Sequence, residues 1–397
     1  MSCINNINGN NGWGNITGIR PVKMMKKLIA DGYTYDEAKL EFIRSYLVSE
    51  EKAELLAGIA KKQLALLLGD GCKEVCLYIG IPFCKTRCLY CSFITAESGT
   101  EQVLVQPFVE ALMKELSATA GIVRRHGLSI KSIYFGGGTP TILTAEQLKQ
   151  IIDGCKSFFN LEGLKEFTVE AGRPDTLDES KFFAMKVAGV TRISINPQSM
   201  KDETLRAIGR RHSAEDIVKA FKMARLHGFD DINADVIAGL PFETADDFKA
   251  TLNELEKLLP ESVTVHTMSI KRGSRLHETL GDVALSDAAV VEEMTDYARE
   301  FMKNAGREPY YLYRQKNMLG NLENTGYAKG GCECLYNIII MDETADIISC
   351  GGGGVTKIVS RTDGTVNRIF NVKEPKDYIE RIDEMIERKN LIDKYIK

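Results

Sequence analysis

The sequence has little of what marks a membrane protein, a secreted protein or a nucleic-acid-binding protein. No apolar run approaches the roughly 18 residues that span a bilayer, and the opening stretch MSCINNINGNNGWGN lacks the basic-then-apolar layout of a signal peptide. Lysine and arginine number 51 against 55 aspartates and glutamates, so the net charge of −4 includes no basic excess for nucleic acid. We therefore expect a cytoplasmic protein with no membrane span and no nucleic-acid partner.

Cysteine is present, but without the even distribution of a disulfide framework. The chain has ten cysteines in 397 residues, and three of them fall in one short segment. This usage favours a reducing compartment over the disulfide scaffold of a small secreted domain. Cys332 and Cys334 form a further close pair to which the sequence assigns no role.

From residue 74 onward, short β-branched runs alternate with longer stretches of helical periodicity. Parallel neighbouring strands need crossovers of this length, so we expect a parallel sheet with helices outside it. The simplest such α/β architecture is a partial (β/α)6 barrel over residues 74–290. The predicted strands are residues 74–82, 130–138, 166–172, 192–199, 231–239 and 262–269, and the predicted helices are residues 106–127, 144–159, 178–189, 213–228 and 245–259.

Two flanking regions differ in pattern from this core. Residues 1–73 carry two helical patterns and are predicted to form a helical N-terminal region. Residues 291–397 mix helices and strands, and we expect this C-terminal part to cap the open, substrate side of the barrel. In such barrels the chemistry gathers where the strands end, and Glu170, Gln198 and Asp235 all lie at or just past a predicted strand.

The segment IGIPFCKTRCLYCSF has a cysteine spacing of C-x3-C-x2-C, formed by Cys84, Cys88 and Cys91. A structural zinc site normally has four Cys or His ligands, and no convincing second pair follows, so zinc is disfavoured. A redox disulfide would normally show an isolated C-x-x-C. A [4Fe–4S] cluster held by three thiolates keeps one iron free for a ligand that is not protein, and this interpretation fits best.

The spacing, with Tyr90 just before the last cysteine, resembles the signature of radical S-adenosylmethionine (SAM) enzymes. A second motif, YFGGGTPT at residues 134–141, follows the second predicted strand, where glycines let the backbone approach a ligand and expose its amides. A tight strand-to-helix turn is the alternative interpretation of that motif. The resemblance implies a [4Fe–4S] cluster, with SAM bound to its open iron.

Further stretches resemble the oxygen-independent coproporphyrinogen III oxidase (dehydrogenase) family. They are YIGIPFC, CLYCSF, GGGTPT, EFTVEAGRPDTL, RISINPQSM, LRAIGRRHSAED and NADVIAGLPFET. The flanks WGNITGIRPVK and EPYYLYRQKNMLGNLENTGYA are most similar to the HemZ-type branch. This resemblance implies oxidative decarboxylation of coproporphyrinogen III to protoporphyrinogen IX, two propionates becoming vinyls, with an external electron donor and acceptor.

The resemblance also implies roles for individual residues. Cys84, Cys88 and Cys91 would hold the cluster. The implied contacts to SAM are Tyr78, Gly137, Gly138, Thr139, Glu170, Gln198, Arg210 and Asp235. A carboxylate can accept hydrogen bonds from ribose hydroxyls or an amino group, and an arginine can bind a carboxylate through two parallel hydrogen bonds. The alternative is structural: Arg210 as a charge at a helix end, and the acids as supports of the barrel mouth.

A tetrapyrrole substrate with four propionates calls for cations and aromatic surface. The stretch YYLYRQKN supplies Tyr311, Arg314 and Lys316 as candidate substrate contacts, beside Tyr310 and Tyr313. Arg272 and Arg275 follow the sixth predicted strand. The alternative is a tyrosine-rich turn that packs the C-terminal part onto the barrel.

Two other functions remain compatible with these motifs. A haem-binding or haem-delivery protein could have the same barrel and cluster, and a radical SAM methyltransferase that opens haem is a further relative. The chain also departs from the family pattern at Gly80, where H-I-P-F-C is common and this sequence reads GIPFC. That departure bears on catalytic detail more than on cluster binding.

Overall fold

The computed structural model describes residues 12–18, 20–67, 73–93, 96–97, 102–278 and 285–396. At its centre is an eleven-stranded sheet in the order β13-β12-β11-β1-β4-β5-β6-β7-β8-β10-β9. A separate pair is formed by β2 (Phe83–Cys84) and β3 (Ala96–Glu97). The main strands are β1 Glu74–Ile81, β4 Ser129–Gly137, β5 Glu166–Glu170, β6 Arg192–Ser194, β7 Ile232–Ala238, β8 Ser262–Thr267, β9 Glu308–Tyr313, β10 Asn324–Ala328, β11 Asp346–Gly351, β12 Val355–Val359 and β13 Val366–Phe370.

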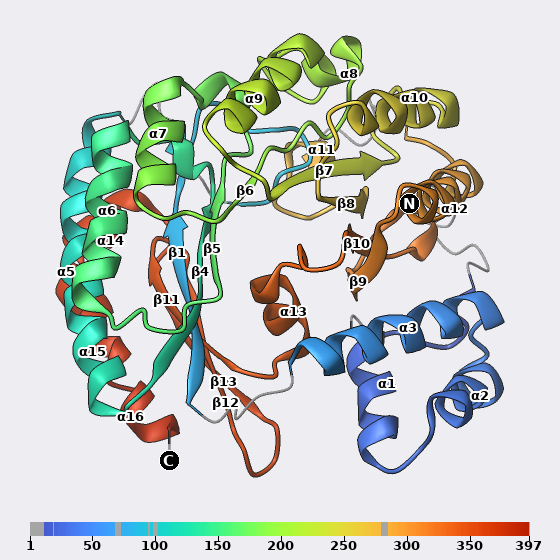
Figure 1. The fold of residues 1–397 in the computed structure, drawn as a ribbon, viewed down its shortest axis with the longest axis horizontal. Helices are drawn as coiled ribbons and strands as arrows, with labels where there is room; N and C mark the ends of the chain where they lie inside the picture. Colours follow the sequence, from blue (N-terminus) through green and yellow to red (C-terminus); the bar gives the residue numbers. More distant parts are fainter. Residues whose placement is uncertain are drawn as a thin grey trace.

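The six strands expected from the sequence are confirmed as β1 and β4 to β8. From β11 to β8 every neighbouring pair is parallel, whereas the pairs β13-β12, β12-β11, β8-β10 and β10-β9 are antiparallel. The sheet curves strongly (Figure 1), but within the described residues no pairing joins β13 to β9. The architecture is therefore the expected partial barrel, not closed into a full one.

Helices cover the convex face of the sheet, as parallel crossovers require. They are α5 Val105–Arg125, α6 Ala145–Phe158, α7 Glu179–Val187, α8 Asp202–Ala207, α9 Ala214–Leu226 and α10 Ala245–Glu256. Several begin at a capping box, in which a Thr or Ser and a residue three positions on satisfy each other's main-chain amides. Among the described residues, no helix is long and apolar enough to cross a bilayer.

The expected C-terminal cap is present, and this part of the chain also adds strands to the sheet. Beyond α11 (Arg275–Glu278) and α12 (Ala288–Asn304), it contributes strands to both edges of the sheet. β11 lies beside β1, in parallel, and continues the barrel wall on that side. α13 (Leu335–Asp342) lies inside the curve of the sheet (Figure 1), while α14 (Pro375–Glu380), α15 (Ile382–Lys389) and α16 (Ile392–Tyr395) follow the last strand.

The N-terminal region is helical as expected, with α1 Pro21–Ala30, α2 Tyr35–Tyr46 and α3 Glu50–Leu66; residues 1–11, 19 and 68–72 of that predicted region lie outside the described residues. These helices have their own apolar cluster, which includes Trp13 and Phe42. A buried polar contact ties them to the barrel: the indole of Trp13 and the ammonium of Lys52 both donate to the carboxylate of Glu323. All three side chains are buried, so this contact orients the helical region, whose helices α1 and α3 pack against β9.

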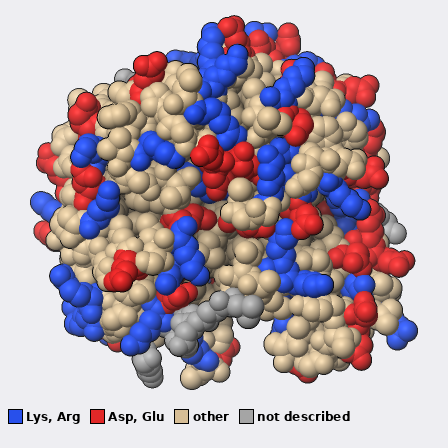
Figure 2. Space-filling view, in the orientation of Figure 1, with Lys and Arg blue, Asp and Glu red and all other residues tan. Residues whose placement is uncertain are grey.

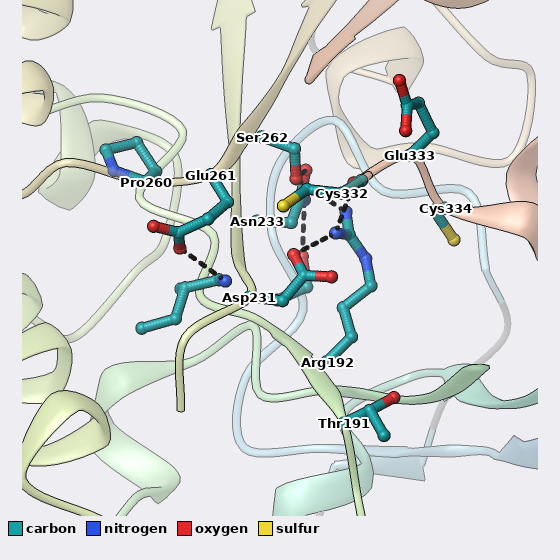
Figure 3. Close-up of polar contacts among 12 residues, drawn as sticks. Thr191, Arg192, Asp231, Asn233, Pro260, Glu261, Ser262, Cys332, Glu333 and Cys334 are labelled. Atoms are coloured by element: carbon teal, nitrogen blue, oxygen red, sulfur yellow. Dashed lines mark hydrogen bonds and ion pairs between the residues drawn. The ribbon is translucent and has the colours of Figure 1, made fainter. Parts of the chain in front are cut away.

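The amino ends of the strands are closed by buried polar contacts (Figure 3). The guanidinium of Arg192, at the start of β6, donates to Asp231 at 2.6 Å, to the hydroxyl of Ser262 at 2.7 Å and to the carbonyl of Cys332 at 3.1 Å. Glu166, at the start of β5, accepts from the first amides of α13. These contacts tie the amino ends of β5, β6, β7 and β8 to the segment before α13 and to its first turn.

Candidate active site

The three cysteines of the C-x3-C-x2-C segment lie in a loop at the carboxyl end of β1. Cys84 is on β2, and the main-chain amide of Cys91 donates to the carbonyl of Cys88 at 3.1 Å, which folds the loop back on itself. Cys84 and Cys91 are half-buried, Cys88 is buried, and none of the three forms a disulfide. The loop is fixed from outside because the amide of Leu89 donates to the carbonyl of Ile208 at 3.0 Å.

The glycine motif at the end of β4 packs directly against this loop. Gly137 has a φ of +103°, which favours glycine, and a Cβ on Gly138 would lie 2.4 Å from the carbonyl oxygen of Phe83. The amides of Gly138 and Thr139 donate to the carbonyls of Ile81 and Phe83, so they are not free for a ligand. The expectation of exposed amides is therefore wrong for these two residues; the glycines instead allow the motif to approach β1 closely.

These two segments enclose a cavity of about 150 Å³. It opens among the carboxyl ends of β1, β4, β5 and β6. Its lining includes three cysteines, three residues of the glycine motif and three further predicted residues: Cys84, Cys88, Cys91, Gly137, Gly138, Thr139, Glu170, Gln198 and Arg210. Nine of the eleven residues predicted for cofactor and metal binding thus meet at one cavity.

Two polar atoms among these lining residues have no partner within the protein. The side-chain oxygen of Gln198 and the Nε of Arg210 are buried and make no hydrogen bond in the described structure. Gln198 also adopts a left-handed backbone, with φ at +67°, held by main-chain bonds to Asp235 and Ile237. A buried polar atom without a hydrogen-bond partner lowers the stability of the folded protein, and so does a residue held in a left-handed backbone conformation. Both features are typical of a ligand site.

Arg210 is oriented by carbonyl groups of the neighbouring strand ends. Its guanidinium donates to the carbonyl of Asn196 at 2.6 Å and to that of Gly172 at 3.2 Å. Although burial opposes its charge, the nearby Tyr90 and Cys88 raise the pKa of Arg210 above its usual range. The side chain is therefore a fixed cation at the cavity wall rather than a solvated helix-end charge.

Glu170, at the end of β5, lies above a stack of aromatic rings. The hydroxyl of Tyr134 donates to its carboxylate at 2.6 Å, and the ring centroid of Tyr134 lies 4.3 Å from that of Tyr336 and 6.2 Å from that of Tyr78. Burial raises the pKa of Glu170 to about 7, with a further contribution from Asp235, against the lowering effect of the Tyr134 hydrogen bond. Its protonation state therefore changes near neutral pH.

Asp235, on β7, keeps its negative charge because of its partners. Burial alone would raise the pKa of Asp235, but His266 and Asn233 lower it below its usual value. The Nε2 of His266 lies 3.6 Å from the carboxylate, and the Nδ1 of His266 lies 3.3 Å from the hydroxyl of Tyr313 on β9. A polar chain thus runs across the barrel interior from Asp235 through His266 to Tyr313.

Comparison with known proteins agrees with this geometry. Residues 78–255 match the radical SAM superfamily. The chain is 41% identical over 380 residues to the oxygen-independent coproporphyrinogen-III oxidase-like protein HemZ of Bacillus subtilis, covering 95% of this chain and 76% of that protein. The chain belongs to the radical SAM superfamily, in the family of HemZ. Its cofactors are accordingly a [4Fe–4S] cluster and SAM.

Two other similarities bear on function and fold. The haem chaperone HemW of B. subtilis is 31% identical over 310 residues, covering 77% of this chain and 76% of that protein. Among solved structures, the radical SAM coproporphyrinogen III oxidase HemN of Escherichia coli matches with a TM-score of 0.63 at 20% identity, covering 82% of this chain and 73% of that chain. The HemN match shows the fold.

The residues present fit the cofactors of a radical SAM protein. Within the described residues, no three His, Cys, Asp or Glu side chains converge on a point suited to a single metal ion. A [4Fe–4S] cluster does not require its ligands to converge on one point, since each thiolate binds a different iron. The unpaired atoms of Gln198 and Arg210 suit the polar groups of SAM, and Arg173 adds a cation, its Nη1 lying 3.6 Å from the Sγ of Cys88.

Two of the predicted SAM contacts lie deeper than the cavity lining. Tyr78 is stacked with Tyr336, with ring centroids 5.7 Å apart, beneath Glu170. Asp235 reaches the lining through its main chain, because its carbonyl accepts from the amide of Gln198 at 2.8 Å. Both residues therefore support the site from below in this structure.

The predicted substrate contacts are placed in three different ways. Tyr311 is buried in the barrel and donates to the hydroxyl of Thr264 at 3.2 Å. Arg314 donates to the carbonyls of Ile16 and Asn321, and its guanidinium stacks on Trp13 with 4.9 Å to the ring centroid. Those contacts favour the packing alternative for Arg314. The side chains of Lys316, Arg272 and Arg275 are exposed.

Sequence reasoning missed three residues of the site. His266 lies inside a predicted strand without a recognisable motif, Tyr134 opens the YFGGG stretch, and Arg173 follows Glu170 in VEAGRPD. The alternation of side chains along a strand could have pointed to His266, since it lies two residues beyond Thr264 on the inward face. Cys332 and Cys334 lie beside the amino ends of β5 and β6, and Figure 3 shows their sulfurs pointing away from each other.

The structure also explains the glycine at position 80. A Cβ on Gly80 would lie 2.8 Å from the carbonyl oxygen of Gly352, just after β11. A histidine at this position would need the backbone of the turn after β11 to move. The glycine at position 80 therefore allows the glycine-rich turn CGGGG, residues 350–354, to pack closely against β1.

Proposed function

We propose that this protein catalyses the oxidative decarboxylation of coproporphyrinogen III to protoporphyrinogen IX in anaerobic haem biosynthesis. The observation that carries the proposal is the cavity in which the three cysteines, the glycine motif, Glu170, Gln198 and Arg210 meet, in a chain related to HemZ over 95% of its length. The bound cofactors would supply a 5′-deoxyadenosyl radical that abstracts a hydrogen atom. Each propionate would then lose CO2 and one electron to an external acceptor, leaving a vinyl group.

In this proposal the protein's own residues bind and orient. Cys84, Cys88 and Cys91 hold the cluster, while Gln198 and Arg210 bind polar groups of SAM with atoms that otherwise have no partner. Glu170 would accept from SAM hydroxyl or amino groups in its ionised form. Gly137, Gly138 and Thr139 shape the cavity wall, and Tyr78 and Asp235 support it.

The tetrapyrrole would lie on the β7 to β9 side of the cavity. The half-buried Tyr313 offers aromatic surface there, backed by the buried ring of Tyr311, with ring planes nearly parallel and centroids 6.2 Å apart. His266 and Lys316 would face its propionates, with His266 held between Asp235 and Tyr313. Arg314 is assigned to anchoring the N-terminal region instead.

The test is an anaerobic incubation of the reconstituted protein with SAM, a reductant, an electron acceptor and coproporphyrinogen III. We expect the loss of two CO2 units per tetrapyrrole together with 5′-deoxyadenosine, detected by chromatography with mass detection. The Cys88→Ala variant should form neither product, and Cys155→Ala, which removes a buried cysteine of α6, should form both. Formation of 5′-deoxyadenosine with an unchanged tetrapyrrole would contradict the proposed substrate.

A haem-delivery function is the second candidate, favoured by the 31% identity to HemW. It predicts tight binding of haem without turnover of coproporphyrinogen. A haem titration followed by its absorption band separates the two candidates. A methyltransferase acting on haem would instead yield S-adenosylhomocysteine and a linear tetrapyrrole, which the same mass detection reports.

A further inference from the structure

A second, larger cavity lies on the outer side of the cysteine loop and shares only Thr86, Arg87 and Arg210 with the lining of the first. Its volume is about 610 Å³. Its lining is rich in basic side chains, with Arg87, Arg206, Arg210, Arg211 and Arg275 beside Asp202 and Asp216. Five arginines thus face two carboxylates in a protein whose net charge is −4.

The two carboxylates are engaged with the start of α9. Asp202 accepts from the amide of Ala214 at 2.8 Å, and Asp216 accepts from the amide and the hydroxyl of Ser213 at 2.9 Å each. A helix N-terminus carries partial positive charge, so these two acids compensate the helix rather than the arginines. The cavity is therefore a concentrated cationic surface.

Two of its arginines extend into solvent. Arg206 and Arg211 are exposed, and the one ion pair that the described structure gives Arg206, to Glu203 at 3.6 Å, joins two largely exposed side chains and is therefore weak. The buried Nε of Arg87 has no hydrogen-bond partner. Figure 2 shows basic and acidic side chains interspersed over the viewed face, so a cavity with this arginine excess is a local feature.

This cationic surface lies directly against the cysteine loop. Arg87 lies between Cys84 and Cys88 in the sequence, and Arg87, Arg210 and Thr86 line both cavities. A Cβ on Gly209 would lie 3.4 Å from the carbonyl of Arg87 and 3.9 Å from the Cα of Cys88. The hydroxyl of Thr86 donates to the carbonyl of Gly209 at 2.9 Å. A partner in the outer cavity would thus contact Arg87, the residue next to the cluster ligand Cys88.

We propose that this cavity is the docking site of an acidic one-electron carrier protein that reduces the [4Fe–4S] cluster. The inference rests on the proposed function only in its need for an external electron donor. One electron passes from the reduced carrier to the oxidised cluster through the loop of Arg87 and Cys88; the carrier is oxidised by one electron, and no bond or proton changes place. A protein is favoured over a small anion because a broad acidic face engages several solvated arginines at once.

The test uses the full-length, cluster-loaded protein and two acidic carriers as probes, a bacterial ferredoxin and a flavodoxin. The dissociation constant of each oxidised carrier is measured by calorimetry at low and high salt, and the rate of cluster reduction by each reduced carrier is followed by absorbance without tetrapyrrole. The double variant Arg206→Glu with Arg211→Glu is compared with a charge-matched control, Lys27→Glu with Arg44→Glu, both exposed on the N-terminal helices. Iron content and circular dichroism check that each variant is folded and loaded.

We expect the double variant to bind at least one carrier about tenfold or more weakly than the wild type, with a smaller salt dependence, and to be reduced by it correspondingly more slowly. Reduction by dithionite should stay unchanged, and the control should behave as the wild type.

The proposal is overturned if neither carrier binds the wild type in a salt-dependent way, or if the double variant matches the wild type or the control. Loss of tetrapyrrole binding in the double variant, with carrier binding intact, would overturn it in favour of a propionate site. Decarboxylation is assayed separately with dithionite, so failure of the proposed function is distinguishable from failure of the docking site.

Discussion

Glu170 gives the most quantitative prediction, because its burial makes protein stability depend on pH. Its pKa rises from 4.5 to about 7 in the folded protein. The folded state therefore binds this proton more tightly than the unfolded state, and stability is lost as the pH rises from about 4.5 to about 7. A shift of this size corresponds to about 3 kcal/mol at most, and because the side chain is partly exposed to the cavity we expect about 2 kcal/mol.

The variant Glu170→Gln removes this titration while keeping the shape of the side chain and its contact with Tyr134. In the apo protein, we expect the variant to gain stability relative to the wild type as the pH is raised from about 5 to about 8, by about 2 kcal/mol over that range. Urea denaturation at several pH values measures the difference. Glu162→Gln, at an exposed loop position, serves as the matched control and should leave the pH profile of the wild type unchanged.

Parallel pH profiles for the wild type and Glu170→Gln would refute the reasoning, since they would mean that the carboxyl is not held at a raised pKa. The groups that face it are the hydroxyl of Tyr134 and the carboxylate of Asp235. Ionised Glu170 would bind SAM better in the proposed role, so the SAM affinity of the wild type should also fall as the pH drops below about 7.

Three further predictions follow from close contacts. Gly138→Ala should weaken SAM binding about tenfold or more in calorimetry, because its Cβ would meet a main-chain oxygen at 2.4 Å, whereas Gly58→Ala in open space should leave binding intact. Arg173→Gln removes a donor 3.6 Å from a cluster sulfur and should lower the midpoint potential of the cluster in an EPR-monitored titration; an unchanged potential would contradict this role. Glu323→Gln leaves a buried lysine unpaired and should cost about 3 kcal/mol in urea denaturation; a cost below about 1 kcal/mol would contradict the anchoring role.

The order of strands and helices in the core could be predicted from the sequence because each element carries its own local signal. β-branched runs mark β1 and β4 to β8, and capping residues such as Thr144 and Ser213 mark the helix starts. The position of the C-terminal strands in the sheet could not be predicted in this way. β11 pairs with β1, and the two segments lie some 270 residues apart, so no local sequence pattern indicates that they are neighbours. Long-range pairing depends on which edges remain open after the core has folded.

The candidate site divides in the same way. The sequence by itself determined the cysteine triplet and the glycine motif, because cluster ligation and close backbone approach each require particular residue types at fixed spacing. Only the tertiary structure decided that Arg314 anchors the N-terminal region, that His266 joins Asp235 to Tyr313, and that the outer side of the cysteine loop carries a cationic cavity. These contacts join residues far apart in the chain, and they exist only because the curved sheet brings the ends of its strands together.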